Sequence, residues 1–324
     1  MHEPAHSAEG ALELEATACS LCGQGDFQSV YSGLGDLRHG LPGSFDVVRC
    51  LACGLVRTMP RPTRDTIAEF YPESYSDYAN RPQLRTQLSL VRRAFSLPHR
   101  LRFGDLEESP PRAGARALEV GSGAGADLAR LAAAGWETWG IEPSADAAAA
   151  AGLLPGVSRQ RIISTTVEEA QLETGSFDLI RMSHALEHAH DPRLAIAQAA
   201  AWLRPNGLLR ILVPNFGSLE RRLFRRRWAG LDVPRHLYHF TPRTLKRLLE
   251  ECGLGLRRVA PQFQGITLAA SVELALDGVR GRPPSPVRRS PAYVAVLPLG
   301  WLAAGFGDGA CLDVLAAKGS EENS

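Results

Sequence analysis

Two short cysteine motifs carry the clearest chemical signal in this 324-residue sequence. Cys19 and Cys22 form one Cys-x-x-Cys pair, Cys50 and Cys53 form a second, and a glycine directly follows each pair. Such a turn brings two thiolates to one ion, and two turns complete a tetrahedral Zn²⁺ site. Two disulfides or redox pairs are the alternative, which a reducing compartment disfavours. We therefore predict a structural zinc ion held by all four thiolates in a small zinc ribbon.

A glycine-rich loop, Gly121-Ser122-Gly123-Ala124-Gly125, lies between an apolar segment at 117–120 and a helical segment that starts at Ala126. Glycines let the backbone come close to a ligand, and the start of a helix offers unpaired N–H groups. Glu142, which ends the next predicted strand 21 residues after Gly121, can accept both hydroxyls of a ribose. The loop alone also fits NAD, because Gly121, Gly123 and Ala126 match G-x-G-x-x-A.

Histidines are the third group of candidate residues. His184 and His188 follow a predicted strand at 177–182 and are four residues apart, which predicts that they share one face of a helix. An imidazole titrates near neutral pH and can take the proton of a hydroxyl acceptor. His188 is the first candidate for such a base and His184 the second, whereas His236 is a candidate for contacting the acceptor. A capping or core-edge histidine is the alternative for His184 and His188, and a surface loop with one buried histidine is the alternative for the segment around His236.

These residues require a framework, which the alternation of strand and helix patterns from residue 116 onward provides. Predicted strands cover 117–120, 137–141, 177–182 and 208–213. Asp191-Pro192 and Thr241-Pro242 each combine an N-cap residue with a proline in the first helical turn. Such alternation predicts an α/β fold, a Rossmann-like doubly wound sheet that binds its ligand at the carboxyl ends of the strands.

Further motifs give the glycine loop a family context. They are Glu119 two residues before Gly121, the segment 176–180 followed by Leu186-Glu187-His188 and Asp191-Pro192, and the segment 203–209 before a buried strand. Together they closely resemble class I S-adenosylmethionine-dependent methyltransferases, in the branch with a Leu-Glu-His-x-x-Asp-Pro motif, over roughly residues 118–260. The cysteine pairs and the segment 232–240 are similar to bacterial members that carry a zinc ribbon before this domain.

The resemblance implies a set of residues around the cofactor S-adenosylmethionine. The loop lines its methionine part, Glu119 approaches its amino group and Glu142 holds its ribose. The segment 164–167, Ser-Thr-Thr-Val, departs from the many relatives that place an acidic residue near the adenine, so the adenine pocket is not assigned. The complete set of implied cofactor residues is Glu119, Gly121, Ser122, Gly123, Gly125, Glu142 and Ser183.

The residues His184-Ala-Leu-Glu187-His188 also spell H-x-x-E-H, the zinc signature of inverted metallopeptidases. A peptidase is disfavoured, because the motif follows a Rossmann strand and the sequence offers no evident third ligand. Some related methyltransferases use a divalent metal to methylate catechols. Two histidines and one glutamate at this spacing do not establish such an ion, so its use stays open.

The chain divides into a disordered tail at 1–18, the zinc ribbon at 19–60, a helical linker or cap at 61–113 and the S-adenosylmethionine-binding methyltransferase domain at 114–324. This last domain has an insertion at about 215–240. The insertion contains the basic segment 221–227, which is either a solvated helix face or a surface that recruits an anionic acceptor or touches a membrane. Cys252 and Cys311 lie in apolar patterns and are expected to be buried core thiols.

Composition restricts the partners. The chain has 36 Lys and Arg against 35 Asp and Glu, so no overall excess of positive charge favours binding to nucleic acid. The N-terminal segment lacks the basic and apolar regions of a signal peptide, and no apolar stretch reaches the ~20 residues of a membrane span. We expect a cytoplasmic protein without a transmembrane segment.

The function that agrees best with these observations is methylation of a small molecule or glycan, at a hydroxyl group rather than at nitrogen or carbon. An RNA methyltransferase that binds its substrate with the ribbon is the first alternative. Methylation of a base is disfavoured, because Met182-Ser183-His184 stands where base methyltransferases have an Asn/Asp-Pro-Pro-aromatic motif. A non-catalytic cofactor-binding scaffold is the second, and the intact glycine loop and Glu142 argue against lost cofactor binding.

Overall fold

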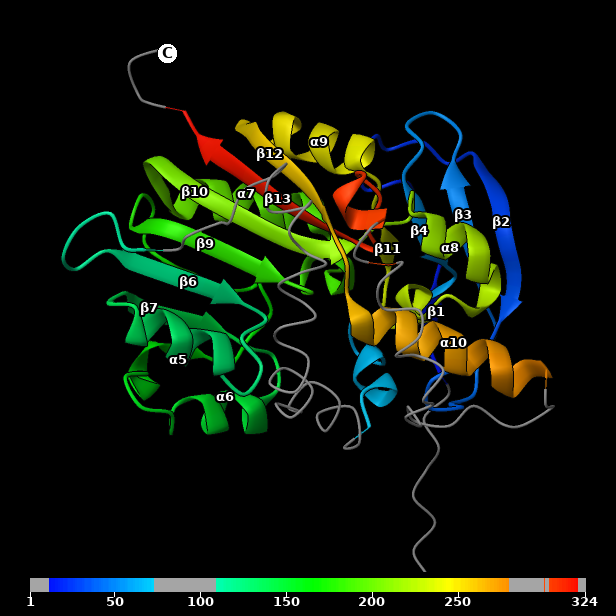
Figure 1. Cartoon of the computed structure of the whole chain (residues 1–324), viewed down its shortest axis with the longest axis horizontal. Coiled ribbons are helices and arrows are strands. Elements are labelled where there is room, and N and C mark those ends of the chain that lie inside the picture. Colours follow the sequence, from blue (N-terminus) through cyan, green and yellow to red (C-terminus); the bar gives the residue numbers. More distant parts are fainter. Residues whose placement is uncertain (1–11, 73–108, 280–299, 301–302, 320–324) are drawn as a thin grey trace, which may run out of the picture.

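The computed structural model describes residues 12–72, 109–279, 300 and 303–319. Its larger part is a sheet of seven strands (Figure 1). In spatial order these are β12 (Leu254–Gln262), β13 (Cys311–Lys318), β10 (Leu203–Pro214), β9 (Phe177–Ser183), β6 (Arg116–Val120), β7 (Glu137–Ile141) and β8 (Ile162–Ile163). The strands from β10 to β8 are parallel, and β13 is antiparallel to both of its neighbours. The predicted α/β, Rossmann-like fold class is confirmed.

Four of the described helices connect strands of the larger part. They are α5 (Ala126–Ala133), α6 (Ala145–Ala151), α7 (Pro192–Trp202) and α9 (Pro242–Glu251). Capping side chains set the start of α7 and of α9. The Asp191 carboxylate accepts the N–H groups of Arg193 and Leu194 at 3.1 and 3.0 Å, and the side chains of Thr241 and Thr244 cap the start of α9 reciprocally. Both helix starts predicted from an N-cap residue and a proline are therefore confirmed.

A second, antiparallel sheet contains most of the N-terminal region. Its order is β11 (Tyr238–His239), β4 (Val56–Met59), β3 (Phe45–Cys50) and β2 (Phe27–Leu34), and the short strands β1 (Leu14–Glu15) and β5 (Arg61–Pro62) pair beside it. Because Leu14 and Glu15 pair with Pro62 and Arg61, the predicted disordered tail is too long: residues 12–18 are described, and residues 1–11 lie outside the described part. The sequence of so short a strand carries no periodic signal.

The two sheets are joined by a strand and by a common hydrophobic core. β11 lies within the predicted insertion at about 215–240 but pairs with β4 of the N-terminal sheet, Tyr238 opposite Arg57 and His239 opposite Val56. The main hydrophobic core includes Leu21 and Leu55 together with Leu245 and Leu248 of α9. The region around the cysteines is thus packed directly onto the larger domain.

The rest of the insertion forms short helices. These are α8 (Leu219–Phe224) and the 3-10 segments η4 (Arg225–Arg227) and η5 (Ala229–Leu231), which contact α10 (Gly265–Val279). Of the predicted cap at 61–113, the structure shows the 3-10 segment η1 (Ile67–Phe70), and residues 73–108 lie outside the described part. Further 3-10 segments are η2 (Arg159–Arg161) and η3 (Leu186–His188). Among the described helices, none combines the length and the apolar character that a membrane span needs.

Candidate functional site

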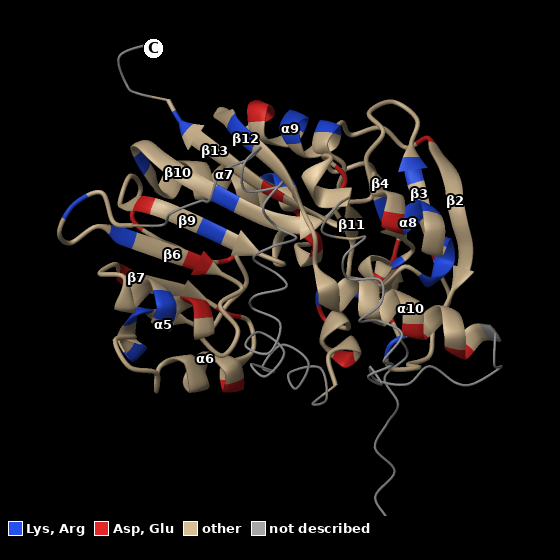
Figure 2. Cartoon of the chain, viewed as in Figure 1, with Lys and Arg blue, Asp and Glu red and all other residues tan. Residues whose placement is uncertain are grey.

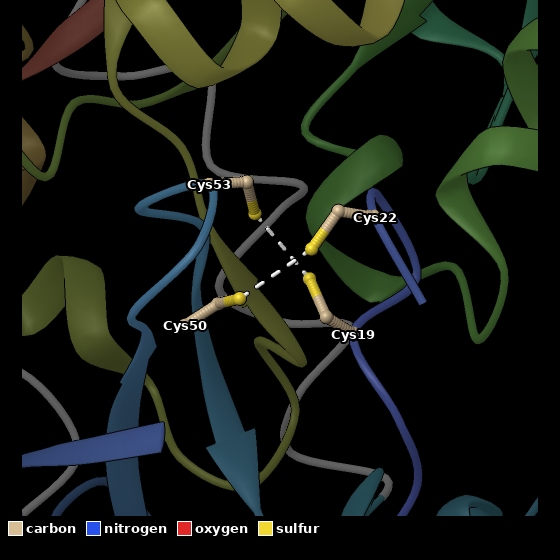
Figure 3. A group of neighbouring side chains, drawn as sticks. All are labelled: Cys19, Cys22, Cys50 and Cys53. Atoms are coloured by element: carbon tan, nitrogen blue, oxygen red, sulfur yellow. Dashed lines mark hydrogen bonds between the residues drawn. The ribbon is translucent and has the colours of Figure 1, made fainter. Parts of the chain in front are cut away.

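The four cysteines of the two motifs come together. Figure 3 shows their sulfur atoms pointing toward a common centre, from the two turns that follow residues 18 and 49. Cys19 Sγ lies 3.5 Å from Cys53 Sγ, Cys22 Sγ lies 3.5 Å from Cys50 Sγ, and all four sulfurs lie within 4.8 Å of one another. Sulfurs bound at about 2.3 Å around a tetrahedral zinc ion are about 3.8 Å apart. The donor set and its spacing therefore fit one zinc ion.

Local backbone geometry explains why the turns present their thiols this way. Gly23 and Gly54 adopt positive φ angles of 74° and 79°, and each donates its N–H to the carbonyl of the first cysteine of its pair, at 2.7 and 2.9 Å. Burial by itself raises the pKa of Cys50, but the backbone N–H of Cys53 and the neighbouring Cys22 thiol lower it to about 7. A lowered pKa favours the thiolate that binds metal.

The two other cysteines differ from each other. Cys311 is buried on β13, as expected for a core thiol. The same expectation for Cys252 is wrong, because this residue caps the end of α9 and is only half-buried, with its sulfur 3.7 Å from the carbonyl oxygen of Arg193. Neither lies in the cluster of four.

The glycine loop joins β6 to α5 and contacts the acidic residue predicted to serve it. Glu142, directly after β7, accepts the N–H of Gly123 at 2.8 Å and the N–H of Ser144 at 2.9 Å. Gly121 has φ +70°, and a Cβ added there would lie 2.9 Å from the Cβ of Ala185. At Gly123, φ is +52°, and no described atom lies within 4 Å of the position a Cβ would take. There is therefore free space next to Gly123, whereas Gly121 is packed against Ala185.

Two of the implied cofactor residues have neighbours that the sequence did not indicate. Glu119 is buried and forms an ion pair with Arg181 of β9, Oε2 to Nη1, at 3.2 Å, and Arg181 also donates to Ser183 Oγ at 3.2 Å. The Ser122 hydroxyl is buried beneath the loop, because a Cβ on Gly140 of β7 would lie only 2.9 Å from it. Glu119 therefore already has a cationic partner, and the Ser122 hydroxyl is buried against β7.

His184 and His188 do not share a helix face, contrary to the sequence-based expectation. His184 adopts φ +55° and donates its backbone N–H to Leu212 of β10 at 2.8 Å, so the chain turns there and only the 3-10 segment η3 follows. Its Nδ1 lies 3.0 Å from Glu187 Oε1, and its Nε2 accepts from the side-chain amide of Gln264 at 2.6 Å. Both ring nitrogens of His184 are thus engaged.

His188 instead approaches His236. The centroids of the two rings are 4.7 Å apart and the rings meet edge to face. His188 Nδ1 lies 3.0 Å from the carbonyl oxygen of Arg235 and 2.8 Å from the hydroxyl of Tyr71. A carbonyl only accepts, so the proton of the neutral ring lies on Nδ1. Burial, together with the neighbouring His236, lowers the pKa of His188 to about 4, which keeps the ring neutral at pH 7.

His236 and Glu187 complete this group. His236 Nδ1 lies 2.9 Å from the carbonyl oxygen of Gly230, so it too carries its proton on Nδ1, and burial lowers its pKa. Glu187 is fully buried. Burial by itself raises the pKa of Glu187, but the hydrogen bond from His184 and the nearby His188 lower it to about 2, so the carboxylate is ionised. One ligand atom from each of Glu187, His188 and His236 lies within 4.8 Å of the others.

A buried ion network holds the segment before β11 in place. The Arg235 guanidinium donates to both oxygens of Asp36, at 2.6 and 2.9 Å, and to Asp232 at 2.8 Å. Arg38 pairs with the other oxygen of Asp232 at 3.1 Å. Asp36 and Arg38 belong to the N-terminal region, so this network fixes the carbonyl of Arg235, and with it the ring of His188, from the ribbon side.

The basic segment 221–227 is committed in part to structural contacts. Arg221 donates to the carbonyl of Phe216 at 2.9 Å, Arg227 donates to that of Leu274 at 2.8 Å, and Arg226 donates to that of Ser32. Figure 2 shows acidic and basic residues interleaved along the strands of the large sheet rather than gathered on it by sign. The hydrogen bonds of these guanidiniums connect the segment 221–227 with its own insertion, with α10 and with the N-terminal sheet.

Reasoning from the sequence missed several residues of the site. Arg181, Gln264, Tyr71 and Asp36 contact Glu119, His184, His188 and Arg235 from elsewhere in the chain. Only Arg181 carried a local signal, because a charged residue within the apolar segment 179–182 requires a partner.

Comparison with known proteins identifies the family. The sequence pattern of a protein family described as a methyltransferase domain matches residues 88–259 of this chain. This range includes the glycine loop, Glu142 and η3. The chain belongs to this methyltransferase family, and its sheet is that of the class I S-adenosylmethionine-dependent methyltransferases.

Individual relatives are more distant. The ubiquinone biosynthesis O-methyltransferase of Nitrobacter winogradskyi is 31% identical over 152 residues, which cover 44% of this chain and 58% of that protein. The chain spans about half the length of the curated relatives it matches. Among solved structures, a methyltransferase of Haloferax volcanii in complex with the Trm112 methyltransferase activator aligns with a TM-score of 0.52 and 13% identity, over 80% of this chain and 100% of that one. This likeness supports the fold alone.

Proposed function

We propose that the protein transfers a methyl group from S-adenosylmethionine to a hydroxyl oxygen of a small molecule. The observation that carries the proposal is Glu142, whose carboxylate is held at the open side of the glycine loop by the N–H groups of Gly123 and Ser144. The family of the chain and the relatives named O-methyltransferases support the same reaction. A glycan is a second source of hydroxyl groups within this proposal.

The residues present fit S-adenosylmethionine. Space at Gly123, the positive φ angles of the loop and an acidic residue after β7 are the features a ribose and a methionine moiety need. Within this proposal Glu142 holds the ribose, while Gly121, Ser122, Gly123 and Gly125 line the methionine part through their backbone. Glu119 then acts through its pair with Arg181, together with Ser183, at the amino-acid end of the cofactor.

S-adenosylmethionine supplies a methyl group on a sulfonium, which is already activated for displacement. The protein must align an acceptor oxygen with it and accept the proton that leaves when the oxygen–carbon bond forms. His188 is the proposed base, because its Nδ1 is hydrogen-bonded to Arg235 and its Nε2 retains a lone pair, whereas both nitrogens of His184 are engaged. His236 orients the acceptor beside it, and His184 positions Glu187.

We further propose that the Cys19, Cys22, Cys50 and Cys53 thiolates hold a structural zinc ion, so that residues 19–60 form the zinc ribbon characteristic of one branch of these methyltransferases. The distances between the sulfurs support this proposal. Thiolates that must stay reduced agree with a cytoplasmic location. The methyltransferase domain then covers 114–324, and the segment 61–113 lies between the two.

Binding of the cofactor is the first test. Calorimetric titration of the wild-type protein is expected to show S-adenosylmethionine binding in about the low-micromolar range and much weaker binding of NAD. Glu142→Ala is expected to weaken binding about 10- to 100-fold, because two hydrogen bonds to a charged acceptor are lost. Glu173→Ala is the matched control, since the side chain of Glu173 is 81% exposed. Preference for NAD would overturn the proposal.

Turnover is the second test. Labelled S-adenosylmethionine is supplied with phenols, sugars, lipids and RNA, and methylation of a hydroxyl-bearing small molecule is expected. His188→Gln is expected to lower turnover about 10²- to 10⁴-fold while cofactor affinity is unchanged. Methylation of RNA alone would contradict the small-molecule acceptor, and binding of the cofactor without turnover on any acceptor would favour a scaffold.

A further inference from the structure

We propose that Glu187, His188 and His236 form a binding site for a divalent transition-metal ion, separate from the cluster of four cysteines. One potential ligand atom from each residue lies within 4.8 Å of the other two. Ligands bound at about 2.1 Å around a tetrahedral ion are about 3.4 Å apart, so modest side-chain rotation brings the three atoms to bonding distance. His236, brought in by the segment before β11, supplies the third ligand that the H-x-x-E-H motif lacks.

The main chain keeps the three residues together. The backbone N–H of Leu237 donates to the carbonyl of Glu187 at 2.8 Å, which ties the segment before β11 to η3. His236 follows Arg235, whose side chain is locked between Asp36 and Asp232. Two of the ligands therefore lie on η3, and the third lies on a segment that is hydrogen-bonded to η3. The backbone of the fold thus keeps the three residues next to one another.

Each proposed ligand already has the outer partner that metal ligands need. His188 Nδ1 and His236 Nδ1 donate to the carbonyls of Arg235 and Gly230, which leaves Nε2 of each ring unprotonated and able to coordinate. Asp232 Oδ2 lies 3.9 Å from His236 Nε2, beyond hydrogen-bond distance. A histidine that binds a metal through one nitrogen typically donates its other N–H to such a carbonyl or to a carboxylate. Glu187 Oε1 accepts from His184 Nδ1, which leaves Oε2 for the ion.

The charge of Glu187 points to a cation. Its side chain is fully buried, and within the described part of the chain its Oε2 has no hydrogen-bond partner. The two nearby arginines are already balanced, because Arg235 and Arg38 pair with Asp36 and Asp232. A buried carboxylate oxygen without a hydrogen-bond donor is costly, and a bound ion removes that cost.

The donor set selects the kind of ion. Two imidazoles and one carboxylate suit Zn²⁺, Fe²⁺, Co²⁺ or Ni²⁺ and disfavour Mg²⁺ and Ca²⁺, which require mostly oxygen ligands. Three protein ligands leave coordination positions open for another oxygen. In this respect the site differs from the four-cysteine cluster, which is complete by itself.

The catalytic consequence rests on the proposed function. An acceptor hydroxyl bound at the open position loses its proton more readily, because the ion stabilises the resulting oxyanion. His188 then acts as a ligand rather than as the base. The proton passes to solvent, and the oxygen forms its bond to the methyl carbon as the sulfur keeps the electron pair of the broken bond.

Counting bound metal tests the site directly. The full-length protein is dialysed against Zn²⁺ and then against buffer, and zinc per chain is measured by elemental analysis. Two ions per chain are expected for the wild type and one for Glu187→Gln and for His188→Gln. Tyr71→Phe is the matched control, because Tyr71 contacts His188 on Nδ1 rather than on the coordinating nitrogen, and it is expected to retain two. Circular dichroism verifies that each variant is folded.

Co²⁺ substitution identifies which site is lost. Thiolate ligands give Co²⁺ an intense near-ultraviolet charge-transfer band, whereas nitrogen and oxygen ligands give only weak visible bands. Glu187→Gln is expected to lose the weak bands and keep the intense one. One ion per folded wild-type chain that gives the intense thiolate band, or two ions in Glu187→Gln, would overturn the proposal even if the variants proved unstable. Methylation by a wild type with one ion leaves the proposed function standing, and two ions without methylation leave the metal site standing.

Discussion

Arg235 shows how single residues couple the ribbon to the histidines. Its guanidinium and the side chain of Asp36 have no exposed surface, and Asp232 is 1% exposed. Burial by itself raises the pKa of Asp36, but hydrogen bonds from Arg235 lower it, so the pair is ionised. The carbonyl of Arg235 accepts from His188, so a change at Asp36 is transmitted to the site without touching it.

Asp36→Asn is therefore expected to lower the free energy of unfolding by about 3–5 kcal/mol, the usual cost of removing one partner from a buried ion pair. Urea unfolding at pH 7 measures the change. Asp26→Asn is the control, since Asp26 belongs to the same region and is exposed. An Asp36→Asn variant as stable as the control would show that Asp232 alone suffices to hold Arg235.

At the residue scale, the sequence predicted those groups of residues that are brought together by spacing within short segments. The two Cys-x-x-Cys turns, the glycines of the loop and Glu142 all lie in short segments whose function depends on near neighbours, and the structure brings each set together. Arg235 and Asp36 are 199 residues apart in the chain, and Gln264 and His184 are 80 apart. Such pairs arise only from tertiary packing, so no pattern in the sequence could reveal them.

At the scale of elements, α8 and α10 meet at a partly buried carboxyl group. Glu220 of α8 accepts from the Trp228 indole N–H at 3.2 Å and from the Ser271 hydroxyl of α10 at 3.4 Å. Burial outweighs these hydrogen bonds and raises the pKa of Glu220 from 4.5 to about 7. The folded protein therefore holds a proton that the unfolded chain releases between pH 4.5 and 7.

This contribution to stability is fully present below pH 4.5 and falls as the pH rises through 7. Glu220→Gln keeps the hydrogen-bond acceptor and removes the charge, so it is expected to raise Tm at pH 8 and to change Tm little at pH 4.5. Calorimetry at both pH values measures this difference, with Glu250→Gln on the half-exposed surface of α9 as the control. A variant that is less stable than the wild type at pH 8 would contradict the prediction.

The boundaries of helices and strands could be predicted where capping residues set them. They could not be predicted where contacts with residues far away in the sequence set them. Asp191-Pro192 and Thr241-Pro242 start α7 and α9 at the predicted residues. The helix expected at His184 is absent, because the backbone of His184 bonds to β10 and its ring bonds to Glu187 and Gln264. β11 has two residues and exists only because β4 offers an edge.

At the scale of the whole molecule, the cysteine cluster is part of the main core. Cys19 and Cys50 are 2% and 1% exposed and belong to the same hydrophobic cluster as Leu245, Leu248 and Leu249 of α9. Arg193 of α7 also donates to the carbonyl of Leu21 at 3.3 Å. Loss of the proposed zinc ion therefore disturbs the methyltransferase domain as well as the ribbon.

Removal of zinc by a strong chelator is expected to lower Tm by several degrees or more in a single cooperative transition, because folding of the ribbon and of its packing surface depends on the metal. Calorimetry before and after chelation measures this. The Glu187→Gln variant, which keeps the four cysteines, should still show a single transition that chelation lowers, which assigns this part of the effect to the cysteines, and Cys252→Ser should bind zinc normally. Two transitions, with the larger one unmoved by chelation, would contradict the coupling.

The position of β13 has a consequence for synthesis of the chain on the ribosome. β13 lies between β10 and β12, and among the described strands it is the sole partner of β12. β12 ends at Gln262 and β13 begins at Cys311, so 48 residues emerge between them. During translation, β10 and β12 each expose an unpaired edge until this last strand arrives, and unpaired edges invite aggregation. The nascent protein therefore passes its most vulnerable interval after its candidate site residues have been made, and before β13 can pair with β10 and β12.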